Sequence, residues 1–277
     1  MTLTNYAIST ARSLWYRASE PVKLRMARKA NEECALCDGG PNQYHPSRYP
    51  LVSVVIPTYN RSALLLERSL KSVLSQTYWN MEVIVAAHGC TDETEQLVRA
   101  IPDRRVRLLS VPRTRTYPPT AENHWFVGPV VPINAGLAAA RGAYIARNDD
   151  DDVWTADHIE SLLRFCADGN HEFVSAAHAT DRGIVAPYVE NGVAIGGVQT
   201  WLYRSYLKTF RANPHAWRKR WARVNDTDLQ DRFMKAGVRM GYLDKVVAHV
   251  LPRPGETEVG LKAYRSNPEI TAKYAFR

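Results

Sequence analysis

Short apolar runs alternate with longer segments of mixed polarity from about residue 51 to residue 250. The runs cover residues 52–56, 82–86, 106–111, 143–146, 173–177 and 246–250. A continuous apolar run of this length is typical of a strand that is buried on both faces of a sheet. The segments between the runs predict helices at residues 64–76, from 92, at 134–140, at 156–167 and from 225. Strands that alternate with helices in this way predict an α/β fold with a mostly parallel, three-layer sheet.

Four consecutive aspartates, Asp149 to Asp152, follow the apolar run at residues 143–146. Adjacent like charges repel by roughly 1 kcal/mol per close pair even in water. A folded chain accepts them either in a solvated acidic turn or around a cation. Carboxylate oxygens suit Mg²⁺ or Mn²⁺, which share their coordination shell with substrate phosphates. Because open α/β sheets bind ligands at the carboxyl ends of their strands, we expect a metal site here.

The turn after the first strand, residues 57–61, contains no glycine. Its backbone therefore cannot approach a pyrophosphate as a G-x-G-x-x-G turn does. If the sheet binds a nucleotide, a metal ion has to hold the phosphates instead, and the aspartates offer that ion a site. The proline-rich segment 112–132 is long enough to predict a functional loop.

The first 50 residues differ from the rest of the chain. Between Ala7 and Ala30 a single acid, Glu20, accompanies six basic residues, which are Arg12, Arg17, Lys23, Arg25, Arg28 and Lys29. Pro21 predicts a break into two shorter helices. A basic amphipathic segment that contains a tryptophan, here Trp15, lies either in a membrane interface or across its own domain. Residues 38–50 are typical of a linker, so we expect a basic extension with its linker at 1–50 and a single domain at 51–277.

Composition and charge narrow the class of protein. With 277 residues, 45% hydrophobic and 23% charged, the chain can bury one good core. Its apolar runs are far shorter than a membrane span. Four cysteines do not form a disulfide framework, which favours a reducing compartment and hence the cytoplasm. Cys34 and Cys37 form only half of a zinc site. The net charge of +8 indicates an anionic partner.

Several ordered motifs resemble glycosyltransferase family 2, the nucleotide-sugar-dependent transferases of GT-A fold. The matching segments are Ser53–Arg61, Ser72–Thr77, Glu82–Val85, Gly89–Asp92 and Asn134–Leu137, and Tyr144–Ile145 then lead into the acidic run. The likeness covers about residues 50–250. It implies a nucleotide-sugar half at about 51–152, an acceptor half at about 153–277, and inverting transfer to an acceptor hydroxyl.

The resemblance also implies roles for particular residues. Asp149-Asp150-Asp151 resembles the D-x-D motif, so Asp149 and Asp151 would ligate Mn²⁺ or Mg²⁺ on the diphosphate. Late histidines are metal ligands in several GT-A families, which makes His249 a candidate, although a lone strand histidine is often structural. Residues expected to border the nucleotide are Pro57, Thr58, Tyr59, Arg61, Ala87, Asp92, Asp149 and Asp150. Ala87 stands where the family usually has the first Asp of Asp-Asp-Gly-Ser.

The acceptor half contains a basic aromatic window and then two aspartates. From Asn191 to Asn225 there is no acid, and aromatic residues are interleaved with cations, with Trp217 and Trp221 spaced as on one helical face. Such a window suits sugar stacking, a phosphorylated acceptor, a lipid headgroup or single-stranded nucleic acid. The alternative is a core-facing stripe with a solvated basic face. Asp226 resembles the family's general base, with Asp228 as the second candidate. The alternative for Asp226 is a plain helix cap.

Together these features predict metal-assisted, single-displacement transfer from a nucleoside-diphosphate sugar. A UDP-sugar is favoured and a GDP-sugar is the second choice, with a glycan, lipid-linked or other hydroxyl acceptor. Nucleic acid is not expected as a partner, and a peripheral membrane contact is left open. Two other classes also remain open: a metal-dependent nucleotidyltransferase and a non-catalytic basic binding module.

Overall fold

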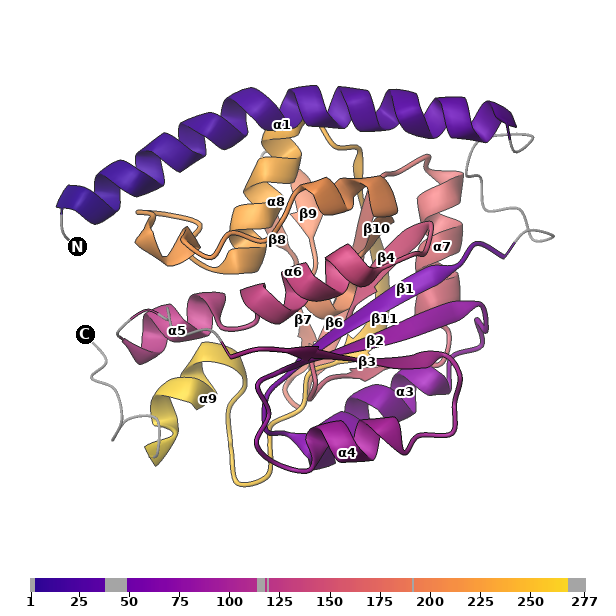
Figure 1. Ribbon diagram of the computed structural model, residues 1–277, viewed down its shortest axis with the longest axis vertical. Coiled ribbons are helices and arrows are strands. Elements are labelled where there is room, and N and C mark those ends of the chain that lie inside the picture. Colours follow the sequence, from indigo (N-terminus) through magenta and orange to yellow (C-terminus); the bar gives the residue numbers. More distant parts are fainter. Residues whose placement is uncertain (1–2, 38–48, 114–117, 119, 191, 269–277) are drawn as a thin grey trace.

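A mixed β-sheet forms the centre of the molecule (Figure 1). The computed structural model describes residues 3–37, 49–113, 118, 120–190 and 192–268. The strands of the main sheet are β1 (Val52–Thr58), β2 (Met81–His88), β3 (Val106–Val111), β4 (Tyr144–Arg147), β5 (Val153–Trp154), β6 (Phe173–Thr180), β7 (Gly183–Val185), β10 (Leu202–Arg204) and β11 (Met240–His249). A separate hairpin consists of β8 (Tyr188–Glu190) and β9 (Val193–Ile195).

The strand order places the carboxyl ends of the first four strands at one edge. The sheet runs β3-β2-β1-β4-β10-β6-β11-β5, and β7 pairs with β6. Strands β1 to β4 are parallel to their neighbours in this group, and β6 is parallel to β11. Strand β10 is antiparallel to both β4 and β6. The turns that follow β1, β2 and β4 therefore lie side by side, which is the arrangement that the apolar runs predicted.

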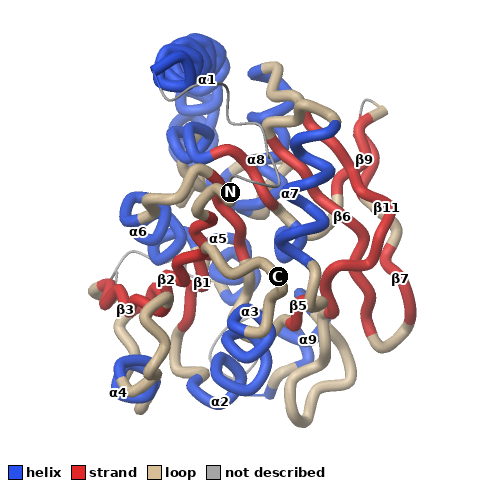
Figure 2. The backbone as a smooth tube through the Cα atoms, turned by 90° about the vertical axis from the view of Figure 1, so that its right-hand side faces the viewer, coloured by secondary structure: helices blue, strands red, loops and turns tan. Residues whose placement is uncertain are grey.

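Helices cover both faces of the sheet, as Figures 1 and 2 show. One face carries α2 (Ser62–Leu64), the π-helical turn η1 (Leu65–Leu70), α3 (Lys71–Leu74), α4 (Thr94–Arg99) and α7 (His158–Asp168). The other carries α5 (Ala121–Val127), α6 (Val130–Ala139), α8 (Asn225–Ala236) and α1 (Leu3–Cys37). The 3-10 turns η2 (Val198–Thr200) and η3 (Ser205–Thr209) flank β10 in the chain, and a third, η4 (Ala216–Arg218), contacts α5 and α8. Helix α9 (Gly260–Ser266) contacts α5. The predicted three-layer α/β architecture is confirmed.

Alternating side chains of the buried strands build two cores. Val52, Val54 and Ile56 of β1 face the core under α3 and α7. Val55 faces the opposite core, under α6 and α8. Gly136 of α6 lies directly over β1, since a Cβ at this position would approach Val55 Cγ1 to 2.5 Å. The close approach of α6 thus requires a glycine, and it holds α6 over the middle of the parallel strands.

Two sequence predictions are wrong, and both concern proline. The segment 112–132 is not a long loop, because α5 and α6 begin within it; its residues 114–117 and 119 lie outside the described part of the chain. Thr120 caps α5 by accepting a hydrogen bond from the Asn123 N–H at 3.3 Å. Pro129 and Pro132 stand at the start of α6, where a backbone N–H needs no helical partner. These prolines start a helix where the sequence suggested a loop.

Pro21 does not divide the N-terminal helix. Helix α1 runs from Leu3 to Cys37 with Pro21 inside it, although an interior proline costs about 3 kcal/mol. Tertiary contacts on either side hold the helix together: Glu20 is buried against Arg232 of α8, and Leu24 lies in the core. The helix therefore packs across its own domain. The side chains of Cys34 and Cys37, and residues 38–48 of the predicted linker, lie outside the described residues.

No helix in the described ranges combines the length and apolar character needed to cross a bilayer.

Candidate active site

The acidic run lies at the sheet edge where the parallel strands end. Thr58, the last residue of β1, pairs with Ala87 of β2. On the other side of β1, Asn148 donates its backbone N–H to Val55 O at 3.2 Å, which fixes the point where the chain leaves β4. The Asn148 amide also donates to Ser69 Oγ at 3.0 Å. The four aspartates therefore begin a turn that is anchored to β1 and to the helix following it.

Two of the aspartates are held by side chains from distant parts of the chain. Asp150 accepts hydrogen bonds from Thr58 Oγ1 and from Arg61 Nη1, both at 2.8 Å. Asp151 accepts one from Arg253 Nε at 2.6 Å and lies 3.6 Å from Arg61 Nη1. Burial alone would raise the pKa of Asp151, but Arg253 and Arg61 outweigh it and lower that pKa. Thr58 and Arg61, two of the residues predicted to border the nucleotide, thus lie against the acidic run.

Asp149 differs from its neighbours because its carboxylate makes no hydrogen bond or ion pair with any described residue. Burial, reinforced by the negative charge of Asp151, raises the pKa of Asp149 to about 6, and Asp150 and Asp226 act in the same direction against Arg147. Burial and the adjacent carboxylates also raise the pKa of Asp152 well above its ordinary value. The acidic run thus carries more negative charge than the neighbouring Arg61, Arg147 and Arg253 neutralise.

This excess charge is the observation that fits a divalent cation. The donors present are carboxylate oxygens, which suit Mg²⁺ and Mn²⁺. Within the described residues, no three His, Cys, Asp or Glu side chains form a group that could hold a metal. His249 pairs through its backbone with Val153, next to the acidic turn, but the predicted set of Asp149, Asp151 and His249 is not assembled. Any bound cation would need ligands from substrate or water in addition to the aspartates.

A buried arginine that the sequence did not single out lies beside Asp149. Arg147, the last residue of β4, is 3% exposed, yet its Nε and Nη1 have no hydrogen-bond partner within the described structure. Its guanidinium carbon lies 5.6 Å from the centroid of the Trp201 ring. Leaving such donors unpaired is costly unless a ligand or water satisfies them. The available signal in the sequence was a charged residue at the end of an otherwise apolar strand, two positions before Asp149.

The remaining residues predicted to border the nucleotide lie at the same edge but differ in exposure. Pro57 and Ala87 are buried within β1 and β2. The exposed Tyr59 ring is covered by Arg113, whose guanidinium carbon lies 3.9 Å from the ring centroid. Asp92 accepts backbone hydrogen bonds from Ser62 at 3.4 Å and Thr94 at 3.2 Å. Asp92 therefore fixes two helix starts and does not present an unpaired carboxylate to a ligand.

The two candidate bases have different environments. Asp226 is partly exposed at the start of α8, accepts a hydrogen bond from the Thr227 N–H at 2.7 Å, and is close enough to Asp149 to raise its pKa. Asp228 is fully buried; it pairs with Lys219 and, at 2.9 Å, with Arg232 Nε. The Asp228 carboxylate is therefore neutralised by two cations inside the fold. Asp226 has no such partner among the described residues and acts on the charge of the acidic run instead.

The basic aromatic window divides into core and surface residues. Trp201, Tyr203 and Phe210 are buried in the core under α6 and α8, as the core-facing interpretation expected. Trp217 and Trp221 do not share a helical face, because the 3-10 turn η4 ends at Arg218. Trp217 packs against the core, whereas Trp221 is exposed.

With the site placed, the comparisons identify the family. The model for glycosyl transferase family 2 matches residues 53–246, and the chain belongs to this family. The sheet and its two helical layers have the GT-A fold: Staphylococcus aureus TarS 1-349 in complex with UDP superposes with a TM-score of 0.55 at 21% identity, over 73% of this chain and 61% of that one. The mannosyltransferase PcManGT from Pyrobaculum calidifontis, in complex with GDP-Man and Mn²⁺, gives 0.57 at 19% identity, over 91% and 70%.

The alignments with sequence relatives cover only part of each relative. The Escherichia coli UDP-Glc:alpha-D-GlcNAc-diphosphoundecaprenol beta-1,3-glucosyltransferase WfgD is 32% identical over 124 residues, which is 45% of this chain and 44% of that protein. The Rhizobium meliloti succinoglycan biosynthesis protein ExoO is 37% identical over 116 residues, or 42% and 30%. The chain spans less than half the length of the curated relatives it matches.

Proposed function

We propose that the protein is an inverting glycosyltransferase that moves a sugar from a nucleoside-diphosphate sugar to an acceptor hydroxyl. The observation that carries the proposal is the acidic turn at the carboxyl edge of the parallel strands, where the Asp149 carboxylate has no hydrogen bond or ion pair with a described residue and senses the charge of Asp226. Membership of family 2 supports the same reaction class. Asp149 would then act on the donor and Asp226 on the acceptor.

The donor half would use the acidic turn and its arginines. Asp149 and Asp151 would hold Mn²⁺ or Mg²⁺, which when bound stabilises negative charge on the donor's diphosphate. Arg147 has two unsatisfied nitrogens beside Asp149 and would donate to a phosphate oxygen. Thr58, Arg61 and Arg253 would keep Asp150 and Asp151 in place, because each donates to one of these carboxylates.

The acceptor half would supply the base. Asp226 takes the proton from the acceptor hydroxyl as that oxygen attacks the anomeric carbon. The bond between the anomeric carbon and the donor's phosphate oxygen breaks, and the electron pair leaves with the nucleoside diphosphate. One displacement inverts the configuration at the anomeric carbon. Asp228 is excluded from this role in our proposal because Lys219 and Arg232 hold it inside the fold.

For the substrates, a UDP-sugar is favoured and a GDP-sugar is the second choice. TarS was solved with UDP, and PcManGT with GDP-Man and Mn²⁺. The acceptor would be a hydroxyl of a glycan or a lipid-linked sugar, the latter in line with the printed specificity of WfgD. Cys90 and Cys166 are unpaired thiols in the described part of the chain, which is compatible with the expected cytoplasmic location.

The test is a donor screen followed by a matched pair of variants. UDP-, GDP- and dTDP-sugars are incubated with the protein and Mn²⁺, and release of the nucleoside diphosphate is measured. With the active donor and a sugar acceptor, Asp226→Asn should lower kcat by about 10²–10⁴-fold, because that is the usual contribution of a general base. Asp244→Asn, at an exposed aspartate of β11, is the control and should retain full activity.

A protein that turns over no donor, yet binds nucleic acid tightly in low salt and without metal, would instead be the basic binding module. Full activity of Asp226→Asn would show that another group takes the proton. The configuration of the product, read from the anomeric NMR coupling, would decide separately between inversion and retention.

A further inference from the structure

Helix α1 has one face buried in the protein and the opposite face exposed. On the inner face, Glu20 and Leu24 are buried, and Arg28 donates to Glu172 Oε1 at 2.6 Å. Figures 1 and 2 show α1 along one side of the molecule, outside the layer that contains α6 and α8. A helix in this position can present the whole length of its outer face to another surface.

The outer face carries large apolar side chains. Leu14 is 60% exposed, Trp15 64%, Val22 45% and Met26 68%. At 3.6 residues per turn these four positions fall within about 120° of the helix circumference. Because Glu20, Leu24 and Arg28 of the inner face already make the contacts to the domain, none of the four is needed to hold α1 in place. We call these four residues the outer face of α1.

The exposed surface of α1 is strongly basic. The exposed charged residues of α1 between residues 10 and 32 are Arg12, Arg17, Lys23, Arg25, Lys29 and Glu32. Five are cations and one is an anion, and the other acid of this stretch, Glu20, is buried against Arg232. At 3.6 residues per turn, Arg25 and Lys29 fall within the arc of the outer face, and Arg12 and Lys23 fall within about 60° of its edge. Arg17 instead lines the pocket between α1 and α8.

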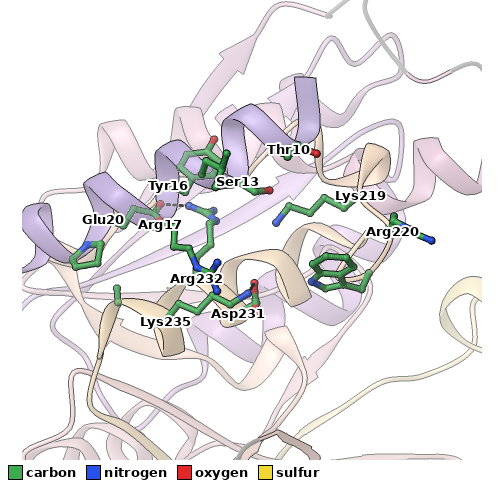
Figure 3. Close-up of a pocket in the computed structure, with 14 residues that line it drawn as sticks. Thr10, Ser13, Tyr16, Arg17, Glu20, Lys219, Arg220, Asp231, Arg232 and Lys235 are labelled. Atoms are coloured by element: carbon green, nitrogen blue, oxygen red, sulfur yellow. Dashed lines mark hydrogen bonds and ion pairs between the residues drawn. The ribbon is translucent and has the colours of Figure 1, made fainter. Parts of the chain in front are cut away.

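A pocket between α1 and the domain adjoins the outer face only at Leu14. It has a volume of about 230 Å³ and lies between α1 and α8 (Figure 3). Arg17 and Leu14 line it from α1, and Lys219, Arg220 and Trp221 line it from the segment before α8. Trp221, at this pocket, is 67% exposed.

Exposed Trp, Leu and Met surrounded by Lys and Arg are what an interfacial helix requires. The apolar side chains enter the headgroup region and the cations attract anionic lipid. A nucleic acid would use the cations but leave the four apolar side chains in water. We propose that the outer face of α1, together with the cations within and beside it, docks the protein on an anionic membrane surface. This proposal does not depend on the transferase reaction.

The test is co-sedimentation of the full chain with vesicles. One set contains equal parts phosphatidylglycerol and phosphatidylcholine, and the other contains phosphatidylcholine alone. The protein should sediment with the anionic vesicles and not with the neutral ones. Binding should weaken in 1 M salt, where the Debye length falls to about 3 Å. Quenching of tryptophan fluorescence by lipids brominated on the acyl chain should accompany binding.

Matched variants assign the binding to the outer face. The variant with Leu14, Trp15 and Met26 all changed to Ser should lower the affinity for anionic vesicles by about tenfold or more, because interfacial binding scales with buried apolar area. The control changes three equally exposed side chains elsewhere, Trp79, Ile184 and Val189, to Ser and should bind as the wild type does. All six side chains are exposed, so unfolding temperatures should stay near that of the wild type.

A charge-reversal pair gives a second readout if a serine variant fails to fold. Arg25→Glu with Lys29→Glu should abolish sedimentation, whereas Lys71→Glu with Arg104→Glu, at exposed positions away from α1, should leave it unchanged. Wild-type protein that does not bind anionic vesicles would overturn the proposal. The proposal would also be overturned by an outer-face variant that binds vesicles as the wild type does. It would be overturned as well if the wild type were a dimer in sedimentation velocity and the outer-face variant a monomer, because a second copy of the chain would then cover this face.

Discussion

Asp228→Asn should destabilise the fold, and it tests whether Asp228 is structural. The carboxylate is fully buried between Arg232, 4% exposed, and Lys219, 10% exposed. Removing the negative charge leaves both cations in the fold, with Glu20 as the nearest remaining anion beside Arg232. Breaking a buried pair in this way costs about 3–5 kcal/mol. At about 2–4 °C per kcal/mol for domains near this size, Tm should fall by about 10 °C.

The matched control is Asp231→Asn on the same helix. Asp231 pairs with Lys235 at 2.6 Å, but the lysine is 42% exposed. Asp231 is buried at 8% exposure, but its partner reaches water, so losing this pair should cost about 1 kcal/mol, well below the cost at Asp228. Thermal unfolding followed by circular dichroism, and urea unfolding at 25 °C, measure both variants. The reasoning is refuted if Asp228→Asn has the same Tm and urea midpoint as the wild type but has lost its activity. Asp228 would then be the catalytic carboxylate.

Two further predictions concern stability. Burial lowers the pKa of His158 to about 3, although its hydrogen bond to Val247 O acts in the opposite direction. Between pH 3 and 6.5 the unfolded protein therefore binds up to one more proton than the folded protein. The free energy of unfolding should fall as pH drops through this window, by up to about 1.4 kcal/mol per pH unit. Urea titrations should show a shallower fall for His158→Gln. Gly196→Ala should lower the urea midpoint, because its Cβ would lie 1.9 Å from Ala176 O, while Gly128→Ala, with its nearest atom at 3.1 Å, should change it little.

The sheet edge was predictable because buried strands and their ends are local features. The apolar run before Asp149 locates a strand, and parallel strands collect their carboxyl ends at one edge. The contacts across that edge were not predictable in the same way. Arg253 reaches Asp151 from 102 residues away, and Arg61 reaches Asp150 across 89. The hydrophobic periodicity of the sequence predicts elements and not contacts between side chains so far apart in the chain.

The failures arise where tertiary contacts override local propensity. Pro21 would end an isolated helix, but burial of Glu20 and Leu24 on either side keeps α1 continuous. Asp226 and Asp228 look alike in sequence, two residues apart at a helix start. Only the fold shows that Lys219 and Arg232 occupy Asp228. Arg147 was overlooked because burial, which makes its unpaired nitrogens unusual, is not visible in the sequence.

The central claim is that the acidic turn clamps a divalent cation onto the donor's diphosphate. Calorimetric titration of UDP and of GDP into the wild type and Asp149→Asn, with and without Mn²⁺, tests it most directly. We expect tight binding of one nucleotide to the wild type only when Mn²⁺ is present, and loss of that dependence in Asp149→Asn. Equal binding with and without Mn²⁺, or an unchanged Asp149→Asn variant, would contradict the account.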